Sequence, residues 1–173
     1  MPQSGAFGAH WRMNSSHTQP GRASPERERQ LALLEKAIGL AVQAHQGQRD
    51  RYQSPYILHA LRVMARVQTL PEKIVAVLHD VVEDTPWTFQ DLQAQGFPQE
   101  ILAALDCLTK RPAEPYESLI ARAALNPLAC RVKVADLEDN MDLRRYAQFG
   151  PPEAKRLARY LAAWETLTAA HGA

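Results

Sequence analysis

The stretch that decides the fold of this 173-residue chain reads Ile74-Val75-Ala76-Val77-Leu78-His79-Asp80-Val81-Val82-Glu83-Asp84. Its five leading residues are apolar, which is typical of a buried segment, yet four ionisable side chains follow within the next six positions. On a continuous helix Glu83 lies over His79 and Asp84 over Asp80, because residues four apart share a face. Charges attached to a buried segment are costly unless they are paired or bind a metal. We therefore predict a metal site here, with further ligands delivered by other helices.

The rest of the chain carries helical patterns and none of the alternation that is typical of strands. Apolar residues recur at three- and four-residue steps, as at Leu31, Leu34 and Ile38, between breaks marked mostly by proline. This pattern predicts an all-α fold, a single bundle of seven or eight helices over residues 24–173. Residues 1–23 are rich in Ser, Gly, Gln, His and Pro, so we expect a disordered N-terminal extension there.

The composition argues against several classes of protein. Lys and Arg number 20 and Asp and Glu 19, a net charge of +1, so we expect neither nucleic acid nor a membrane surface as a partner. No apolar run reaches the length of a membrane span or forms the core of a signal peptide. The two cysteines, Cys107 and Cys130, lack the spacing of a disulfide framework. We therefore expect a cytoplasmic protein, and the sequence predicts no particular oligomeric state.

A second buried helix is predicted to deliver another carboxylate. Residues 131–141 read Arg131-Val132-Lys133-Val134-Ala135-Asp136-Leu137-Glu138-Asp139-Asn140-Met141. Asp136 and Asn140 are four residues apart and share a face, which Lys133 flanks. Glu138 and Asp139 are expected to point elsewhere, into solvent. Nearby, Arg144 and Arg145 are expected to be solvated or packed on the last helix.

Two further segments suggest a ligand site. His59 lies among apolar positions of the helix predicted over residues 54–67, where a histidine is usually a core residue, but the His79-Asp80 pair favours a ligand role. The loop over residues 48–53 carries Arg49, Arg51 and an aromatic residue, which suits a phosphorylated ligand. An ordinary solvated loop explains that composition equally well. Lys133 and Arg122 are further candidates for binding phosphate oxygens, although each taken singly is more often a surface charge.

Four short motifs occur in a fixed order along the chain. They are Ala44-His45-Gln46-Gly47-Gln48, Pro55-Tyr56-Ile57-Leu58-His59, Leu78-His79-Asp80-Val81-Val82-Glu83-Asp84-Thr85 and Lys133-Val134-Ala135-Asp136-Leu137 with Asn140-Met141. In this order they resemble the hydrolase half of the Rel/Spo alarmone enzymes and the stand-alone small alarmone hydrolases. Those enzymes belong to the HD superfamily of metal-dependent phosphohydrolases. An isolated His-Asp pair is weak support for such a resemblance, but the four motifs together are specific.

The resemblance implies an all-helical fold, one manganese ion and removal of the 3′-pyrophosphate from guanosine tetra- or pentaphosphate. Carried over by motif, it implies four metal ligands: His59, His79, Asp80 and Asp136. It implies Glu83 and Asp84 as the acidic pair that orients or deprotonates the attacking water, and Asn140 as a contact to the nucleotide. Two histidines and two carboxylates also suit ferrous iron, with zinc as a further alternative.

The chain departs from the family pattern in several places. Its loop reads Arg49-Asp50-Arg51 where Arg-Lys is usual, and Ala60 replaces a proline. Leu137-Glu138-Asp139-Asn140 replaces Arg-Leu-His-Asn, and Asp142-Leu143 replaces Arg-Thr. These changes spare the implied metal ligands and alter the nucleotide contacts.

The leading hypothesis is therefore a guanosine 3′,5′-bis(diphosphate) (ppGpp) 3′-pyrophosphohydrolase with a small nucleotide as substrate and Arg49, Arg51, Lys133 and Asn140 as substrate contacts. One alternative is an HD-domain phosphohydrolase that acts on another nucleotide or phosphoester. Another is a non-catalytic nucleotide-binding HD domain. A third is a buried ion-pair network that only holds helices together.

Overall fold

The computed structural model describes residues 24–171, so the extension predicted over residues 1–23 lies outside the described residues. The elements of that part of the chain are α1 (Pro25–Ala44), α2 (Ile57–Arg66), α3 (Leu70–Leu78), α4 (Val81–Asp84), α5 (Phe89–Ala94), α6 (Gln99–Leu108), α7 (Tyr116–Ala124), α8 (Pro127–Asn140), the 3-10 turn η1 (Leu143–Arg145) and α9 (Pro151–His171). An isolated bridge between Arg49 and Pro55 is the sole β-type pairing among residues 24–171. The predicted all-α fold is confirmed.

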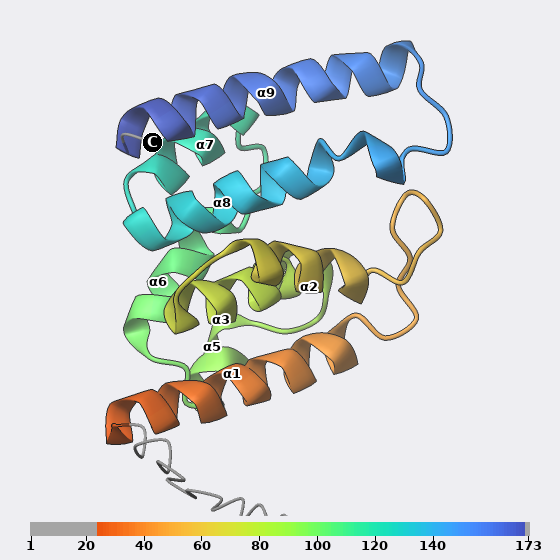
Figure 1. The fold of residues 1–173 in the computed structure, drawn as a ribbon. Coiled ribbons are helices and arrows are strands. Elements are labelled where there is room, and N and C mark those ends of the chain that lie inside the picture. The colour runs from red at the N-terminus through yellow and green to blue at the C-terminus, as the bar shows by residue number, and fades with distance from the viewer. Residues whose placement is uncertain (1–23, 172–173) are drawn as a thin grey trace, which may run out of the picture.

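Helix α3 lies at the centre of the molecule, with α2 beside it, α1 on one side and α8 and α9 on the other (Figure 1). Its residues from Ile74 to Leu78 are at most 1% exposed, because α1, α2, α6 and α8 all pack against it. Burial of this apolar surface is the main source of stability in such a bundle. The helix begins with a capping box, in which Thr69 Oγ1 accepts from the Glu72 N–H and the Glu72 carboxylate accepts from the Thr69 N–H.

The chain turns directly after α3. Helix α3 ends at Leu78, His79 caps it, and Asp80 begins the single turn α4. The predicted continuous helix through this stretch is therefore wrong, although the Asp84 N–H still donates to the Asp80 carbonyl at 2.9 Å. Glu83 turns toward the loop after α6, where its Oε2 accepts from the Lys110 N–H at 2.8 Å. After the turn His79 is still buried, whereas Asp80 is partly exposed at the edge of the core.

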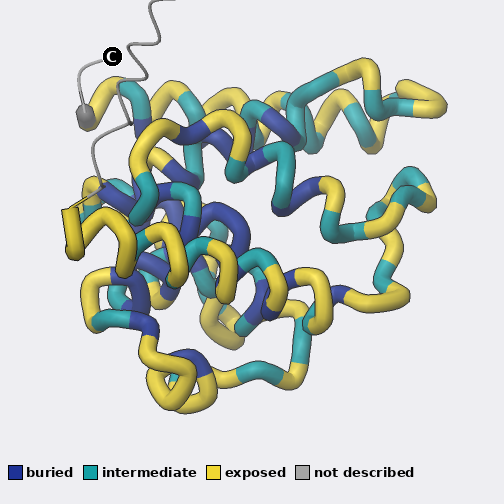
Figure 2. Tube along the Cα trace, turned by 60° about the horizontal axis from the view of Figure 1, so that its bottom comes forward, coloured by how far each residue is buried: buried dark blue, intermediate teal, exposed yellow. Residues whose placement is uncertain are grey.

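Helix α8 lies against α2, α3 and α9. Asn126 begins it, because its Oδ1 accepts from the N–H groups of Leu128 and Ala129 at 3.0 Å each, and Pro127 occupies the first turn. The buried carboxylate of Glu72 forms an ion pair with Arg131 and so joins α3 to α8. Figure 2 shows buried residues gathered between the helices and exposed residues on their outer turns. Among residues 24–171, no helix combines the length and apolarity needed to cross a membrane.

Candidate metal centre

Three helices bring two histidines and two aspartates to one point. His59 comes from α2, His79 from the end of α3 and Asp136 from α8, and one ligand atom of each lies within 4.8 Å of the others. Asp136 Oδ1 is 3.2 Å from His59 Nε2 and 3.7 Å from His79 Nε2. Asp80 Oδ2 is 2.8 Å from His79 Nε2 and 3.8 Å from His59 Nε2. The structure thus brings together all four predicted metal ligands, called here the His–Asp cluster.

The geometry of the His–Asp cluster fits a divalent cation. The Nδ1 atom of His59 lies 2.8 Å from Asp139 Oδ2 and that of His79 2.8 Å from the Ala76 carbonyl, so both Nε2 atoms face the carboxylates. The buried His79 Nε2 makes no hydrogen bond, although Asp80 Oδ2 is close to it. Ligand atoms about 2.1 Å from a shared ion stand roughly 3 Å apart at right angles. Two imidazoles and two carboxylates form a mixed nitrogen–oxygen set that suits a first-row divalent metal.

Both carboxylate oxygens of Asp136 accept hydrogen bonds from neighbours on α8. Lys133 Nζ donates to its Oδ2 at 2.7 Å, and Asn140 Nδ2 donates to its Oδ1 at 2.6 Å. Burial alone raises the pKa of Asp136, but Lys133 and the two histidines hold that pKa well below its usual range. Lys133 and Asn140 both line the cavity described below, and their contact with substrate stays a prediction.

Tyr56 belongs to the site and carries no distinctive signal in the sequence beyond its place three residues before His59. Its hydroxyl donates to Asp80 Oδ2. Its ring centroid is 4.8 Å from that of His45 and 5.7 Å from that of His59. Burial, and then the negative charge of Asp80, raise the pKa of Tyr56 far above its usual range, so the hydroxyl stays protonated and holds the Asp80 carboxylate in place.

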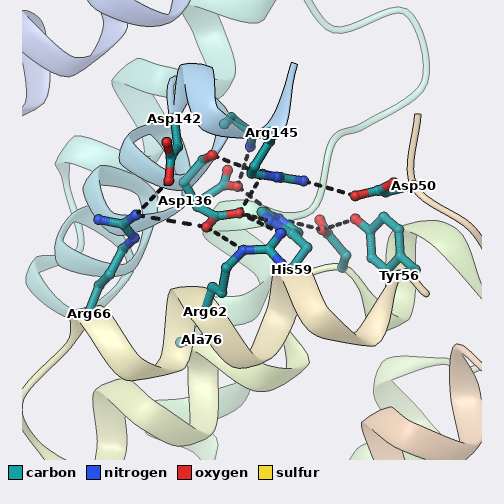
Figure 3. Close-up of polar contacts among 12 residues, drawn as sticks. Asp50, Tyr56, His59, Arg62, Arg66, Ala76, Asp136, Asp142 and Arg145 are labelled. Carbon is teal, nitrogen blue, oxygen red and sulfur yellow. Dashed lines mark hydrogen bonds and ion pairs between the residues drawn. The ribbon is translucent and has the colours of Figure 1, made fainter. Parts of the chain in front are cut away.

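The prediction that Asp139 is solvated is wrong. Asp139 is 0% exposed, and its carboxylate accepts from Arg62 Nε at 2.8 Å, from Arg62 Nη2 at 3.2 Å and from Arg145. The prediction for Arg145 is also wrong, because its side chain folds back from η1 onto Asp139 instead of lying in solvent or on the last helix. Figure 3 shows that it reaches Asp50 as well. The physical reason is helical spacing: Asp139 follows Asp136 by three residues and shares the face that packs against α2. That spacing is the one signal that could have placed it.

A cavity of about 410 Å³ opens above the His–Asp cluster. Glu83 and Asp84, the predicted acidic pair, line it. Partial burial, and then the charges of Asp80 and Glu83, raise the pKa of Asp84. Four arginines, called here the cationic rim, line the same cavity: Arg49, Arg51, Arg145 and Arg156. Arg122 is not among the lining residues, since its guanidinium forms an ion pair with Glu114 at 2.7 Å.

The sequence of this chain is similar to part of several longer proteins. No family profile matches it. The bifunctional (p)ppGpp synthase/hydrolase SpoT of Escherichia coli K12 is 30% identical over 147 residues, which cover 76% of this chain and 20% of SpoT. The guanosine-3′,5′-bis(diphosphate) 3′-pyrophosphohydrolase of Escherichia coli O157:H7 matches with the same identity and coverage. Over these residues the chain is similar in sequence to both enzymes. It spans about a fifth of the length of these curated relatives.

One solved structure is similar in fold to this chain. That structure is described as a metazoan orthologue of SpoT that hydrolyses ppGpp and plays a role in starvation responses. It matches with a TM-score of 0.59 and 23% identity, and the match covers 82% of this chain and 96% of that one. At this identity the match establishes the fold alone, an all-helical domain.

Proposed function

We propose that this chain is a metal-dependent phosphohydrolase that removes the 3′-pyrophosphate from ppGpp. The observation that carries the proposal is the convergence of His59, His79, Asp80 and Asp136 beneath a cavity with four arginines around it. The names of the relatives, a (p)ppGpp synthase/hydrolase and a 3′-pyrophosphohydrolase, support the choice of substrate. A nucleotide with two pyrophosphate groups suits a site that offers several separate cations.

The His–Asp cluster would hold the metal, and the mixed donor set favours manganese, with ferrous iron and zinc as alternatives. A bound divalent cation lowers the pKa of a coordinated water and neutralises charge on a phosphate oxygen. Lys133 and Asn140 keep Asp136 oriented toward this point, and Tyr56 does the same for Asp80. These contacts fix the ligand set before substrate arrives, so little reorganisation is needed on binding.

We assign removal of the proton from the attacking water to the acidic pair, Glu83 and Asp84. Glu83 is held by the Lys110 N–H through one carboxylate oxygen, which leaves the other oxygen to accept the proton. Asp84, with its raised pKa, lies beside it and orients the water or shares the proton. Arg49 and Arg51 from the loop and Arg156 from α9 bind the phosphate oxygens of the substrate from the open side of the cavity.

The test is pyrophosphate release from ppGpp by the purified protein loaded with manganese. We expect release by the unaltered protein and a loss of roughly 10²- to 10⁴-fold in kcat for Glu83→Gln, because a general base contributes about that much. The variant should bind manganese as tightly as the unaltered protein does, since Glu83 is not among the four proposed ligands. Equal rates for both proteins would refute the assigned role of Glu83.

The runner-up is an HD phosphohydrolase for a different nucleotide. Asp142, which stands where the family usually carries arginine, is paired with Arg144 and Arg66, and neither Asp142 nor Arg144 lines the cavity. A panel of nucleotides assayed with manganese separates the two: release from ppGpp alone favours the first proposal, and release from another nucleotide alone favours the second. A protein that binds these nucleotides and manganese but hydrolyses none of them would be a non-catalytic HD domain.

A further inference from the structure

Asp139 is a fully buried carboxylate that the proposed hydrolysis does not use. It is 0% exposed, lies one turn after Asp136 on α8, and is not among the residues that line the cavity. Its oxygens are shared by His59, Arg62 and Arg145. A buried negative charge is costly to keep even when such partners surround it, and apolar side chains would often stabilise the packing as well. We therefore looked for a role of Asp139 other than joining α8 to α2.

The two histidines of the His–Asp cluster are held in different ways. His79 Nδ1 faces a neutral group, the Ala76 carbonyl, at 2.8 Å. His59 Nδ1 instead donates to the Asp139 carboxylate at 2.8 Å, and its Nε2 faces Asp136 and Asp80. A carboxylate on the far nitrogen of a metal-binding imidazole fixes its tautomer and ring orientation and raises its basicity. Asp139 is such a carboxylate partner for His59.

The same carboxylate is also linked to the loop over residues 48–55. Arg145 donates through Nη1 to Asp139. Through Nη2 it donates to Asp50 Oδ2 at 3.1 Å (Figure 3). The other oxygen of Asp50 accepts from the N–H groups of Tyr52 and Ser54 at 2.9 Å each, which shapes the turn between Arg49 and Pro55. One guanidinium therefore connects the partner of a metal ligand to the turn that carries Arg49 and Arg51.

We propose that Asp139 positions His59 for metal binding and, through Arg145, anchors the loop over residues 48–55. The inference rests on the proposed function, because the metal and the loop's phosphate ligand are those of that site. Asp139 touches neither metal nor substrate, so it is a positioning residue. Its removal weakens metal binding and loosens the loop together, whereas removal of Arg145 loosens the loop alone.

Glu72 is the matched control for Asp139. It too is a buried carboxylate, 4% exposed, with an arginine partner, Arg131, and it also joins two helices of the bundle. Its remaining contacts are to the N–H groups of Gln68 and Thr69, and it touches no histidine of the His–Asp cluster. A general effect of losing a buried charge therefore appears in Glu72→Gln, and an effect on the metal site appears in Asp139→Asn only.

The first experiment measures the affinity for Mn²⁺ by electron paramagnetic resonance of the free ion. We expect Asp139→Asn to bind Mn²⁺ about 10- to 100-fold more weakly, the usual cost of losing such a partner. Glu72→Gln should stay within about twofold of the unaltered protein and Arg145→Met within about threefold, because both keep the carboxylate on His59. Unchanged affinity in Asp139→Asn, with Mn²⁺ bound by the unaltered protein, overturns this inference and leaves the proposed function standing. An unaltered protein that binds none of Mn²⁺, Fe²⁺ and Zn²⁺ overturns both.

The second experiment follows amide hydrogen exchange in residues 48–56. We expect exchange of the Tyr52 and Ser54 amides to be about tenfold faster in Asp139→Asn and in Arg145→Met, since both break the charged link to Asp50. Exchange in Glu72→Gln should be unchanged. An unchanged rate in Arg145→Met overturns the anchoring of the loop, whatever the substrate of the enzyme is.

A third measurement needs no variant and covers an Asp139→Asn protein that fails to fold. The unaltered protein is loaded with Zn²⁺, a diamagnetic probe, and the His59 ring is observed by nitrogen-15 and proton NMR. We expect zinc on Nε2 and a slowly exchanging, strongly downfield proton on Nδ1, as a carboxylate partner produces. Zinc on Nδ1, or an Nδ1 proton that exchanges as fast as an exposed one, overturns the inference.

Discussion

The His–Asp cluster and the cationic rim differ in how the chain builds them. The cluster stands on three helices that pack on one another, and His59, His79 and Asp136 are each 4% exposed. Arg49 and Arg51 in the rim are exposed and come from a loop, while Arg156 comes from α9. Packed helices hold the ligand atoms as accurately as a metal requires. A loop is more mobile and tolerates changes in its sequence. The comparison suggests that the cluster sets the chemistry and the rim sets the substrate.

Removal of one cluster residue should have the largest effect. We expect His79→Ala to lose bound manganese and all measurable hydrolysis, because a ligand set of four then lacks a nitrogen donor that no neighbour replaces. Metal content of the purified protein and pyrophosphate release are the two measurements. Circular dichroism checks that the helices remain. A variant that keeps its metal would break the comparison, since the cluster would then not be the metal site.

The sequence predicts all four residues of the cluster but only two of the four arginines in the rim, Arg49 and Arg51. His79, Asp80 and Asp136 follow apolar runs, which place them at the ends or faces of buried helices, and the fixed order of the motifs adds His59. Arg145, Arg156 and Tyr160 reach the cavity because the chain folds back after α8, and no local pattern encodes that path. Asp139 was missed although its spacing of three residues from Asp136 predicts a shared helix face. Its burial depends in addition on where α2 packs, which the sequence alone does not show.

Removal of rim residues should have a smaller and graded effect. We expect Arg49→Ala and Arg51→Ala each to raise KM by roughly five- to tenfold with little change in kcat, because an exposed arginine contributes to binding in the ground state and the transition state alike. Steady-state kinetics with ppGpp are the measurement. Arg29→Ala is the control, because Arg29 is an exposed arginine on α1 that does not line the cavity. A drop in kcat without a change in KM would mean that the rim takes part in the chemistry, and the distinction between the two regions would fail.

The smallest effect is expected from Glu72, which lies outside both regions and joins two helices of the framework, α3 and α8. Burial alone raises the pKa of Glu72, but the N–H groups of Thr69 and Gln68 and the charge of Arg131 lower it, and the net pKa is below the value in the unfolded chain. Ionised Glu72 therefore stabilises the fold above that unfolded value, and the contribution is lost as the pH falls through the folded-state pKa.

Glu72→Gln should lower the free energy of unfolding by about 1.5–3 kcal/mol at pH 7, the range for hydrogen bonds to a charged group. The difference between the variant and the unaltered protein should begin to shrink as the pH falls through the unfolded-state pKa of about 4.3. It should be smallest below the folded-state pKa, where the carboxyl is protonated in both states. Urea denaturation at a series of pH values is the measurement. Hydrolysis at pH 7 should be unaffected, because Glu72 contacts no residue of the His–Asp cluster. If hydrolysis fell in step with stability, the packing of α3 on α8 would govern the geometry of the cluster, and the framework could no longer be separated from the chemistry.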